Sequence, residues 1–424
     1  MKKNNYSTSV STNYTSRKLF IITCAIVYIL AYLIRYLYIG YFVYNNYNFD
    51  DINPDWNAIL PRALFESFVI STVVFFVFFG LSYFRIKSSA YLHVSYKIPG
   101  IYSKISIFVI IIFCIGMRVA YGSRLGEEIT PMPFGLNAPV NRTIDNIIPG
   151  LLLLMMECCW FNGKIKSYRA WIFLLAIFNI TIAALATSKA GMVFFAAELM
   201  MFMYLTGQPI FKRPIMWVVV GFLVLVAFAV GTELRARAGG GTSEYSTLFA
   251  DGDYLGVLFL VAGTFLNRLV GLEGYALSCG YSCSTLPAFS ALNFHSFLGE
   301  AGRIFTQEVV RVGQDFDYRS PGLLGGAALL AGTFGGALLV LVFLRGALTV
   351  LDFADRKEFS VACKVTVVIG LFRFISEGAW MAVDLLAVAL GATLVEICAR
   401  ALRSGRQQPE LPGHGARTNE LELG

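Results

Sequence analysis

Charged residues are scarce in this sequence: they make up 14% of its 424 residues, whereas hydrophobic residues make up 57%. Soluble globular proteins carry about 25% charged and about 45–50% apolar residues. A soluble chain of this length would split into two or more domains, each with its own polar surface. The charge available is too small for such surfaces. Soluble, disordered, collagen-like and coiled-coil proteins are therefore excluded, and the composition predicts an all-α polytopic membrane protein.

Several motifs of enzyme active sites are also absent. The sequence contains no Walker-type glycine loop, no Gly-x-Ser-x-Gly nucleophile elbow, no dinucleotide-binding fingerprint and no zinc-spaced His/Cys cluster. Only three histidines are present. They build no multi-histidine metal site unless His93 joins His295, which we expect on the opposite side of the membrane. We therefore expect no metal and no cofactor.

Long apolar runs are what the sequence has instead. A helix needs roughly 20 apolar residues to cross a bilayer. A further run, 254–266, is only 13 residues long, which suits a re-entrant or interfacial helix. If it crosses, the region 273–298 must return, so we expect ten or twelve spans in one membrane domain, 1–424. The ten longer runs lie near 19–41, 61–84, 104–121, 147–162, 170–188, 190–206, 214–232, 321–344, 364–376 and 379–399.

The distribution of positive charge predicts the orientation of these spans. Of the 34 Lys and Arg residues, 21 lie in the polar tails (1–18 and 404–424) or in alternate short loops and span ends, and every lysine except Lys189 is among them. Such segments stay on the cytoplasmic side. We therefore expect both termini in the cytoplasm and the loops near 42–60, 122–146 and 233–320 outside. This placement of the net charge of +7 favours a lipid bilayer as partner and argues against nucleic acid.

Arginine dominates the basic residues that remain. Twelve of these thirteen residues are arginines, whose planar guanidinium matches phosphate and carboxylate and always keeps its charge. Long loops without secondary structure are uncommon unless functional, so we place the active site in the outer segment 233–320, which includes re-entrant helices. This segment contains Arg235, Arg237, Arg268, Arg303, Arg311 and Arg319.

Each candidate in this segment also has a purely structural explanation. The arginines can cap helix ends or pair with neighbouring carboxylates, as Arg303 can with Glu300 three residues away. His295 can be a buried histidine satisfied between aromatic residues. Lys189, in the tight turn 187–191, faces the same side as the arginines and is a further candidate for a phosphate contact.

Charged residues also occur inside the apolar runs. They are costly in contact with lipid and should face the interior of the helix bundle. Arg373 and Glu377 form an i,i+4 pair. The pattern favours a structural salt-bridge network, with a substrate-lined cavity as the alternative. The residues concerned are Arg35, Glu66, Arg118, Glu157, Glu198, Arg373 and Asp384.

This layout resembles the Wzy-type O-antigen polymerases, which have ten or more spans, both termini inside and an arginine-bearing periplasmic region before the last helices. The family pattern of Arg, ten residues and Gly occurs once, at Arg311 and Gly322. Ser296 replaces the Asn of the related ligases' His-Asn-x-x-Leu element. The local matches are the Pro-Gly helix start with its later Phe-Gly turn (320–326 and 333–336), the turn 187–192, Asn267-Arg268 and 294–298.

The resemblance implies a GT-C-like fold and an enzyme of the bacterial inner membrane. The donor would be a glycan on undecaprenyl diphosphate, the acceptor another lipid-linked repeat unit, and a chain-length regulator a further partner. Arginines would stabilise the departing diphosphate in place of a metal, and a general base would deprotonate the acceptor hydroxyl. We expect Arg235, Arg237, Arg268 and Arg311 to bind diphosphate, with Arg303, Arg319, Lys189 and Arg373 as further substrate contacts. We expect His295 or Glu300 to be the base, with Asp315 or Asp317 behind them.

Two other functions fit the sequence. An O-antigen ligase has the same layout and transfers finished O-antigen to lipid A core. A lipid-linked oligosaccharide flippase belongs to a different class, for which we expect charged residues along a central cavity and short outer loops. The length of 233–320 favours an enzyme.

Overall fold

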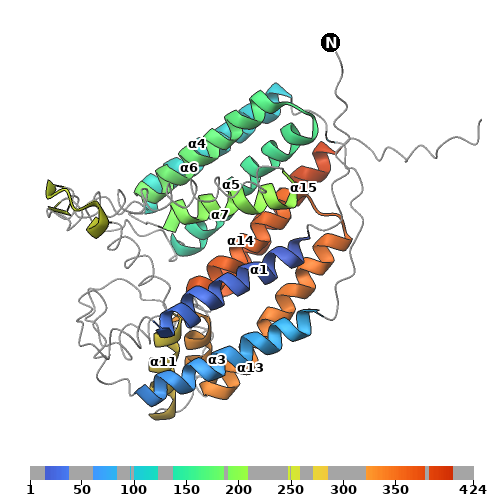
Figure 1. Ribbon diagram of the computed structural model, residues 1–424. Coiled ribbons are helices and arrows are strands. Elements are labelled where there is room, and N and C mark those ends of the chain that lie inside the picture. The colour runs from blue at the N-terminus through green and yellow to red at the C-terminus, as the bar shows by residue number, and fades with distance from the viewer. Residues whose placement is uncertain are drawn as a thin grey trace, which may run out of the picture.

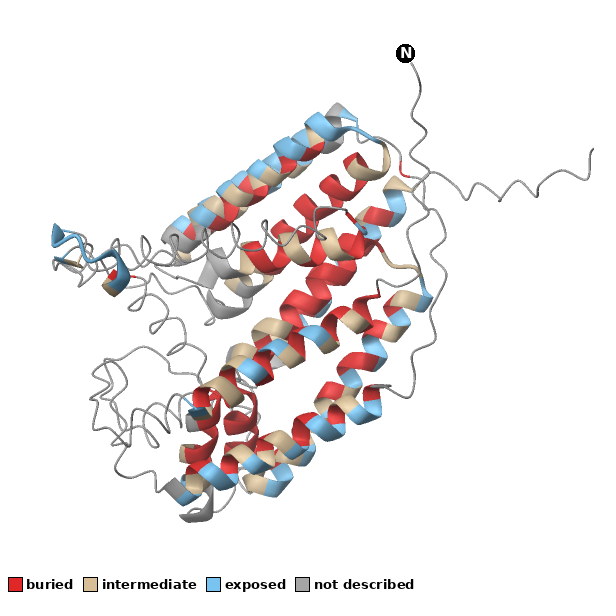
Figure 2. Ribbon diagram, viewed as in Figure 1, coloured by how far each residue is buried: buried red, intermediate tan, exposed pale blue. Residues whose placement is uncertain are grey.

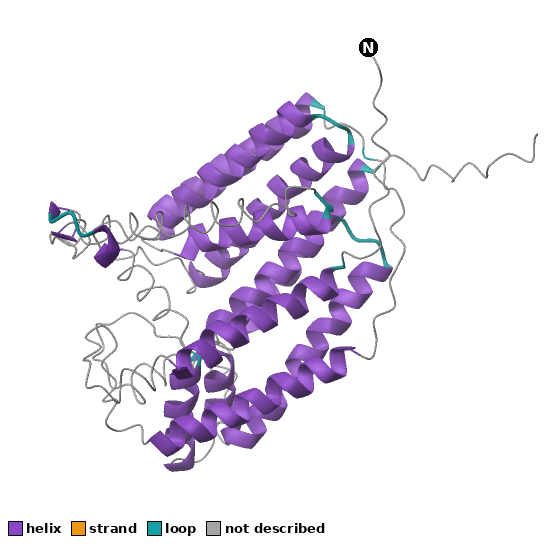
Figure 3. Cartoon of the chain, in the orientation of Figure 1, coloured by secondary structure: helices purple, strands orange, loops and turns teal. Residues whose placement is uncertain are grey.

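The computed structural model describes residues 15–37, 61–83, 96, 100–122, 137–185, 190–208, 247–248, 250–257, 271–284, 321–377 and 382–403. Regular structure within these ranges is helical (Figure 3), apart from an isolated β-bridge between Tyr96 and Arg403. The elements are α1 (Ser16–Tyr28) with its π-helical continuation η1 (Ile29–Ile34), α3 (Pro61–Tyr83), α4 (Ile101–Gly122), α5 (Asn137–Phe161), α6 (Ile165–Leu185), α7 (Ala190–Leu205), α11 (Leu272–Ser284), α13 (Gly322–Arg356), α14 (Val361–Glu377) and α15 (Ala382–Leu402).

Six helices of the described part are long and apolar enough to cross a membrane. Large apolar side chains on their outer faces are exposed, among them Phe76 and Phe113, each 65% exposed. Figure 2 shows such exposed residues along α3 and α4, and buried residues along α5 and α14. A surface of this kind suits acyl chains rather than water. The chain is therefore a helical membrane protein. The run 214–232 and most of 254–266 lie outside the described residues, so the number of spans stays a prediction.

The N-terminus of α1 and the C-terminus of α15 lie at the same end of the bundle (Figure 1). Arg17 in the first turn of α1 pairs with Asp352 near the end of α13 and donates to the carbonyl of Ser82 at the end of α3. Arg403, just after α15, donates to the carbonyl of Glu358, just after α13. We call this face the basic end. The sequence predicts that it is cytoplasmic. Its basic residues include Arg17, Lys18, Lys104, Lys164, Lys166, Arg169, Arg356, Lys357, Arg400 and Arg403.

Helices α5, α14 and α15 pack closely at the centre of the bundle. Gly150 of α5 lies where both neighbours approach. A Cβ there would be 2.6 Å from Cγ2 of Val395 and 2.7 Å from Oγ1 of Thr366. A larger residue would force α5 away from α14 and α15.

Helix α13 is a hairpin rather than one straight helix. Its Gly332 has φ 74° and ψ 176°, a conformation that is essentially restricted to glycine. Beyond this residue the two arms lie in close contact: a Cβ on Gly336 would be 2.7 Å from the Ala327 carbonyl carbon and 2.7 Å from the Ala328 nitrogen. The sequence predicts a span near 321–344, with a Phe-Gly turn at 333–336 as what the family resemblance implies. The structure corrects the span, because the arm that runs to the basic end starts only after Gly332.

The first arm of α13, residues 322–331, packs beside α11 at the end of the bundle opposite the basic end (Figure 1). A Cβ on Gly325 of this arm would be 2.8 Å from the carbonyl oxygen of Gly274 in α11. The Tyr275 hydroxyl of α11 lies 3.5 Å from the carbonyl oxygen of Thr333, just past the fold. With 13 residues, α11 is about 20 Å long. Both elements are therefore shorter than a full span.

Replacing Gly332 with alanine is expected to destabilise the protein by about 1–3 kcal/mol, because a Cβ is strained in this backbone conformation. The measurement is the unfolding midpoint of the purified protein in detergent. Gly346→Ala is the matched control: its Cβ would meet nothing within 4 Å, and alanine is the better helix former. Equal effects of the two changes would contradict the hairpin.

Two sequence-based expectations are wrong. Glu66 does not face the bundle interior: its side chain is 55% exposed and pairs with Arg62 at 2.8 Å, one helical turn away. An ion pair near a helix end reaches the polar interface, so it needs no buried partner.

The outer loop predicted up to residue 146 is also shorter, because α5 already begins at Asn137. The start of α5 stays helical although it contains polar residues, because Asp145 and Asn146 contact neighbouring helices.

Candidate functional site

Among the predicted site residues, the structure describes Arg373. It lies in a group of polar side chains from five helices, namely Arg118, Asp145, Asn179, Glu198 and Arg373, which we call the arginine cluster. The other predicted site residues lie outside the described residues: Lys189, Arg235, Arg237, Arg268, His295, Glu300, Arg303, Arg311, Asp315, Asp317 and Arg319.

Three contacts fix the guanidinium of Arg373 on α14. Its Nη2 lies 3.4 Å from Oε1 of Glu198 on α7. Its Nη1 donates to the backbone carbonyl oxygen of Asp145 on α5, at 3.2 Å. The ring of Phe194 lies under the group, 4.3 Å from the guanidinium carbon, which is a cation–π contact. The arginine is therefore held from two helices other than its own.

The Asp145 carbonyl accepts this bond because of a proline. Helix α5 contains Pro149 in its interior. In an α-helix the carbonyl of residue 145 would accept from the N–H of residue 149, but proline has no N–H. The carbonyl of Asp145 therefore has no intrahelical donor in that position, and Arg373 supplies one from α14.

Asp145 also binds the second arginine of the cluster. Its Oδ2 lies 3.2 Å from Nη2 of Arg118 on α4. Glu198 is completely buried and has Asn179 as a second partner, with Nδ2 of that residue 3.5 Å from Oε2. Two guanidinium groups and two carboxylates thus balance one another in an apolar environment, as buried charges must.

Some polar atoms of the cluster have no hydrogen-bond partner within the described part of the chain. They are Nε of Arg373, Nε of Arg118 and Oδ1 of Asp145, all of them buried. Leaving buried donors and acceptors unpaired is costly. Both guanidinium groups consequently retain a donor with which they could bind an anionic group.

The cluster lies well away from the basic end. Helices α5 and α14 run antiparallel and contact each other at two levels: Glu157 binds the backbone N–H of Val361, and Asp145 binds Arg373. Twelve residues separate these levels on each helix, which corresponds to about 18 Å at 1.5 Å per residue. The hydrocarbon core of a bilayer is about 30 Å thick. The cluster is therefore in the half of the membrane opposite the basic end.

The sequence predicts part of this cluster. It placed Arg118, Glu198 and Arg373 in the bundle interior but gave Arg373 the neighbouring Glu377 as partner. The Glu377 side chain lies outside the described residues, and Arg373 reaches Glu198 and Asp145. Asp145 itself was missed because it follows a polar stretch. The signal that could have found it is Pro149, four residues later.

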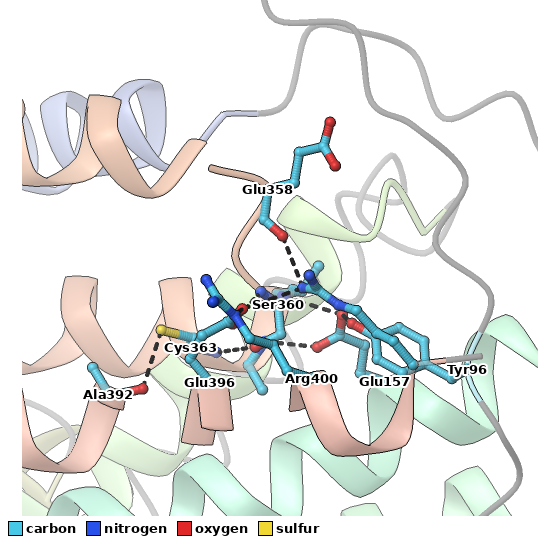
Figure 4. Close-up of polar contacts among 11 residues, drawn as sticks. Tyr96, Glu157, Glu358, Ser360, Cys363, Ala392, Glu396 and Arg400 are labelled. Carbon is cyan, nitrogen blue, oxygen red and sulfur yellow. Dashed lines mark hydrogen bonds and ion pairs between the residues drawn. The ribbon is translucent and has the colours of Figure 1, made fainter. Parts of the chain in front are cut away.

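A second polar group, the capping network, lies at the basic end (Figure 4). Glu157 of α5 accepts from the N–H groups of Val361 (3.0 Å) and Ala362 (2.9 Å), the first two residues of α14. Tyr96 donates its hydroxyl to the same carboxylate at 2.6 Å. Burial and then the nearby carboxylate raise the pKa of the Tyr96 hydroxyl, so it stays protonated and serves as a donor.

The rest of the capping network binds α14 to α15. The N–H of Ser360 donates to Oε2 of Glu396 at 2.8 Å, and the Ser360 hydroxyl accepts from the N–H of Cys363 at 3.1 Å. Arg400 donates to Oε1 of Glu396 at 3.1 Å. Figure 4 shows these side chains converging on the start of α14. They satisfy N–H groups that a helix start leaves without intrahelical partners, which is a structural role. We therefore take the arginine cluster as the candidate functional site.

Comparisons with protein-family models, curated proteins and solved structures find no match to this chain.

Proposed function

We propose that the protein is a membrane glycosyltransferase that polymerises undecaprenyl-diphosphate-linked oligosaccharide repeat units at the periplasmic face of the bacterial inner membrane. The observation that supports this most is the arginine cluster. It contains two guanidinium groups inside the bundle, the buried one of Arg118 and that of Arg373, whose side chain is 12% exposed, in the half of the membrane opposite the basic end. That is the half in which the sequence pattern predicts a lipid-linked diphosphate to bind.

The proposed reaction needs charge stabilisation and one proton transfer. The acceptor hydroxyl oxygen attacks C1 of the donor's reducing-end sugar, and a new glycosidic bond forms. The bond between C1 and the diphosphate oxygen breaks, and its electron pair leaves with undecaprenyl diphosphate. The hydroxyl proton goes to a general base, for which His295 and Glu300 are the first candidates, before Asp315 and Asp317. Guanidinium groups at the diphosphate oxygens stabilise the negative charge as it develops.

The arginine cluster and the outer segment would share this task. Arg373 and Arg118 lie inside the bundle, where a low dielectric strengthens their interaction with phosphate. The arginines of 233–320 approach from the outer side. The charge of Arg373 is already balanced in part by Glu198. Diphosphate binding would therefore require a shift of that carboxylate or the use of Nε, which has no partner among the described residues.

A reconstitution experiment tests the class of function. The purified protein is placed in vesicles that contain only lipid-linked repeat units, with no lipid A core, and the glycans are sized by electrophoresis. The proposal predicts a ladder of longer chains. A ligase does not lengthen them without its acceptor. Transport of the substrate across the vesicle membrane without new glycosidic bonds identifies a flippase and overturns the proposal.

Arg268→Ala is expected to abolish polymer formation while expression and membrane insertion stay normal. Arg268→Lys should also be poor, because lysine does not reproduce bidentate phosphate binding. Arg62→Ala is the control, since this arginine side chain is 86% exposed and, within the described part of the chain, pairs with Glu66 on the same helix. The assay is the glycan ladder in cells and in vesicles. Activity within a few-fold of the parent removes Arg268 from the mechanism.

A further inference from the structure

We propose that Pro149 is a positioning residue: it withholds a backbone donor from the Asp145 carbonyl and so reserves this oxygen for Arg373. The consequence for catalysis rests on the proposed function, whereas the effect on Arg373 itself does not. The backbone of α5, rather than a side chain, would then set where the guanidinium lies.

Pro149 is an unfavourable residue at its position inside α5. Proline is strongly disfavoured in the interior of a helix because it removes a hydrogen bond and crowds the carbonyl four residues earlier. Helix α5 nevertheless continues on both sides of Pro149, from Asn137 to Phe161. The freed carbonyl is not left unpaired, because Arg373 binds it at 3.2 Å. A charged donor is a strong partner for such a carbonyl.

The bond to the Asp145 carbonyl orients the guanidinium of Arg373. Nη1 of Arg373 is taken by the carbonyl, and Nη2 faces Glu198. Nε is the nitrogen without a partner among the described residues. An alanine at 149 would bring back the N–H, which would compete for the carbonyl oxygen. The guanidinium would then be held mainly by the longer contact to Glu198 and by the Phe194 ring.

Asp145 links the two arginines of the cluster. The backbone oxygen of Asp145 binds Arg373, and its side chain binds Arg118. One residue therefore determines the spacing between the two guanidinium groups. If both guanidinium groups contact the same diphosphate, releasing Arg373 from the carbonyl changes the distance between them. This should reduce stabilisation of the transition state more than it reduces the stability of the fold.

The experiment compares two residues at position 149 that differ by one group. Pro149→Ala restores the N–H. Replacing Pro149 with lactic acid by nonsense suppression gives the alanine side chain on an ester bond, which again has no N–H. We expect kcat/KM for lipid-linked repeat units to fall about tenfold with alanine and to stay within a few-fold of the parent with the ester. Equal activities of the alanine and ester proteins would overturn the proposal.

A second measurement does not depend on enzymatic activity. Pro149→Ala is made in the parent and in an Arg373→Leu/Glu198→Leu background. In that background the contact between Arg373 and the Asp145 carbonyl is already absent, and no buried carboxylate remains at position 198. We expect alanine to raise the unfolding midpoint by several degrees more in the double-leucine background than in the parent. Equal shifts would overturn the positioning role. Unequal shifts in a protein that makes no polymer would leave the positioning role standing and remove the proposed function.

Discussion

Replacing Glu157 with alanine is expected to lower the free energy of unfolding by about 3–5 kcal/mol, because each buried donor left without its acceptor costs about 1–3 kcal/mol. The carboxylate accepts from Tyr96 and from the first two N–H groups of α14. Alanine leaves all three donors buried without this acceptor. Unfolding of the purified protein in mixed micelles, followed by circular dichroism, measures the loss.

Two milder changes at the same place are the controls. Glu157→Gln keeps one acceptor oxygen, which serves only one of the two N–H groups because Val361 binds Oε1 and Ala362 binds Oε2, so part of the stability should remain. Tyr96→Phe removes a single hydrogen bond and should cost about 1 kcal/mol. If Glu157→Ala is no worse than Tyr96→Phe, the carboxylate does not cap α14 as the geometry indicates.

The apolar runs predicted most of the helices because a helix that is buried or crosses a membrane requires a long run of apolar residues. The start of α3 at Pro61 and the end of α7 at Leu205 lie within a residue of the predicted runs. The fold of α13 at Gly332 does not interrupt the apolar run, although the Phe-Gly turn noted in the sequence at 333–336 lies directly after it. Its two arms form one continuous apolar run, and only the backbone conformation of a single glycine divides them.

The arginine cluster was harder to predict because its contacts join distant parts of the chain. Arg373 and Glu198 are 175 residues apart, and Arg373 and Asp145 are 228 apart. An i,i+4 rule finds Glu377 instead, since it considers one helix at a time. The carbonyl that binds Arg373 is a backbone group, which residue types do not reveal unless the proline four residues later is considered.

Removing the charge of Arg373 should have two effects that a pair of variants separates. Arg373→Leu leaves Glu198 buried and without its cation, so the free energy of unfolding should fall by about 3–5 kcal/mol. In Arg373→Leu/Glu198→Leu both charges are gone, and most of that stability should return, because a buried ion pair can be replaced by apolar residues at little cost. Stability is measured by unfolding in mixed micelles, and activity by the glycan ladder.

The two measurements should diverge in the double variant. If Arg373 contributes to diphosphate binding, the double variant is stable but forms no polymer, since leucine donates no hydrogen bond to phosphate. If the pair only holds α7 against α14, polymer formation returns together with stability. The second result would make the cluster a structural element and move the whole of substrate binding to the segment 233–320. Because stability is the same in both cases, the glycan ladder of this one protein decides between a salt bridge that supports the fold and an arginine that serves the reaction.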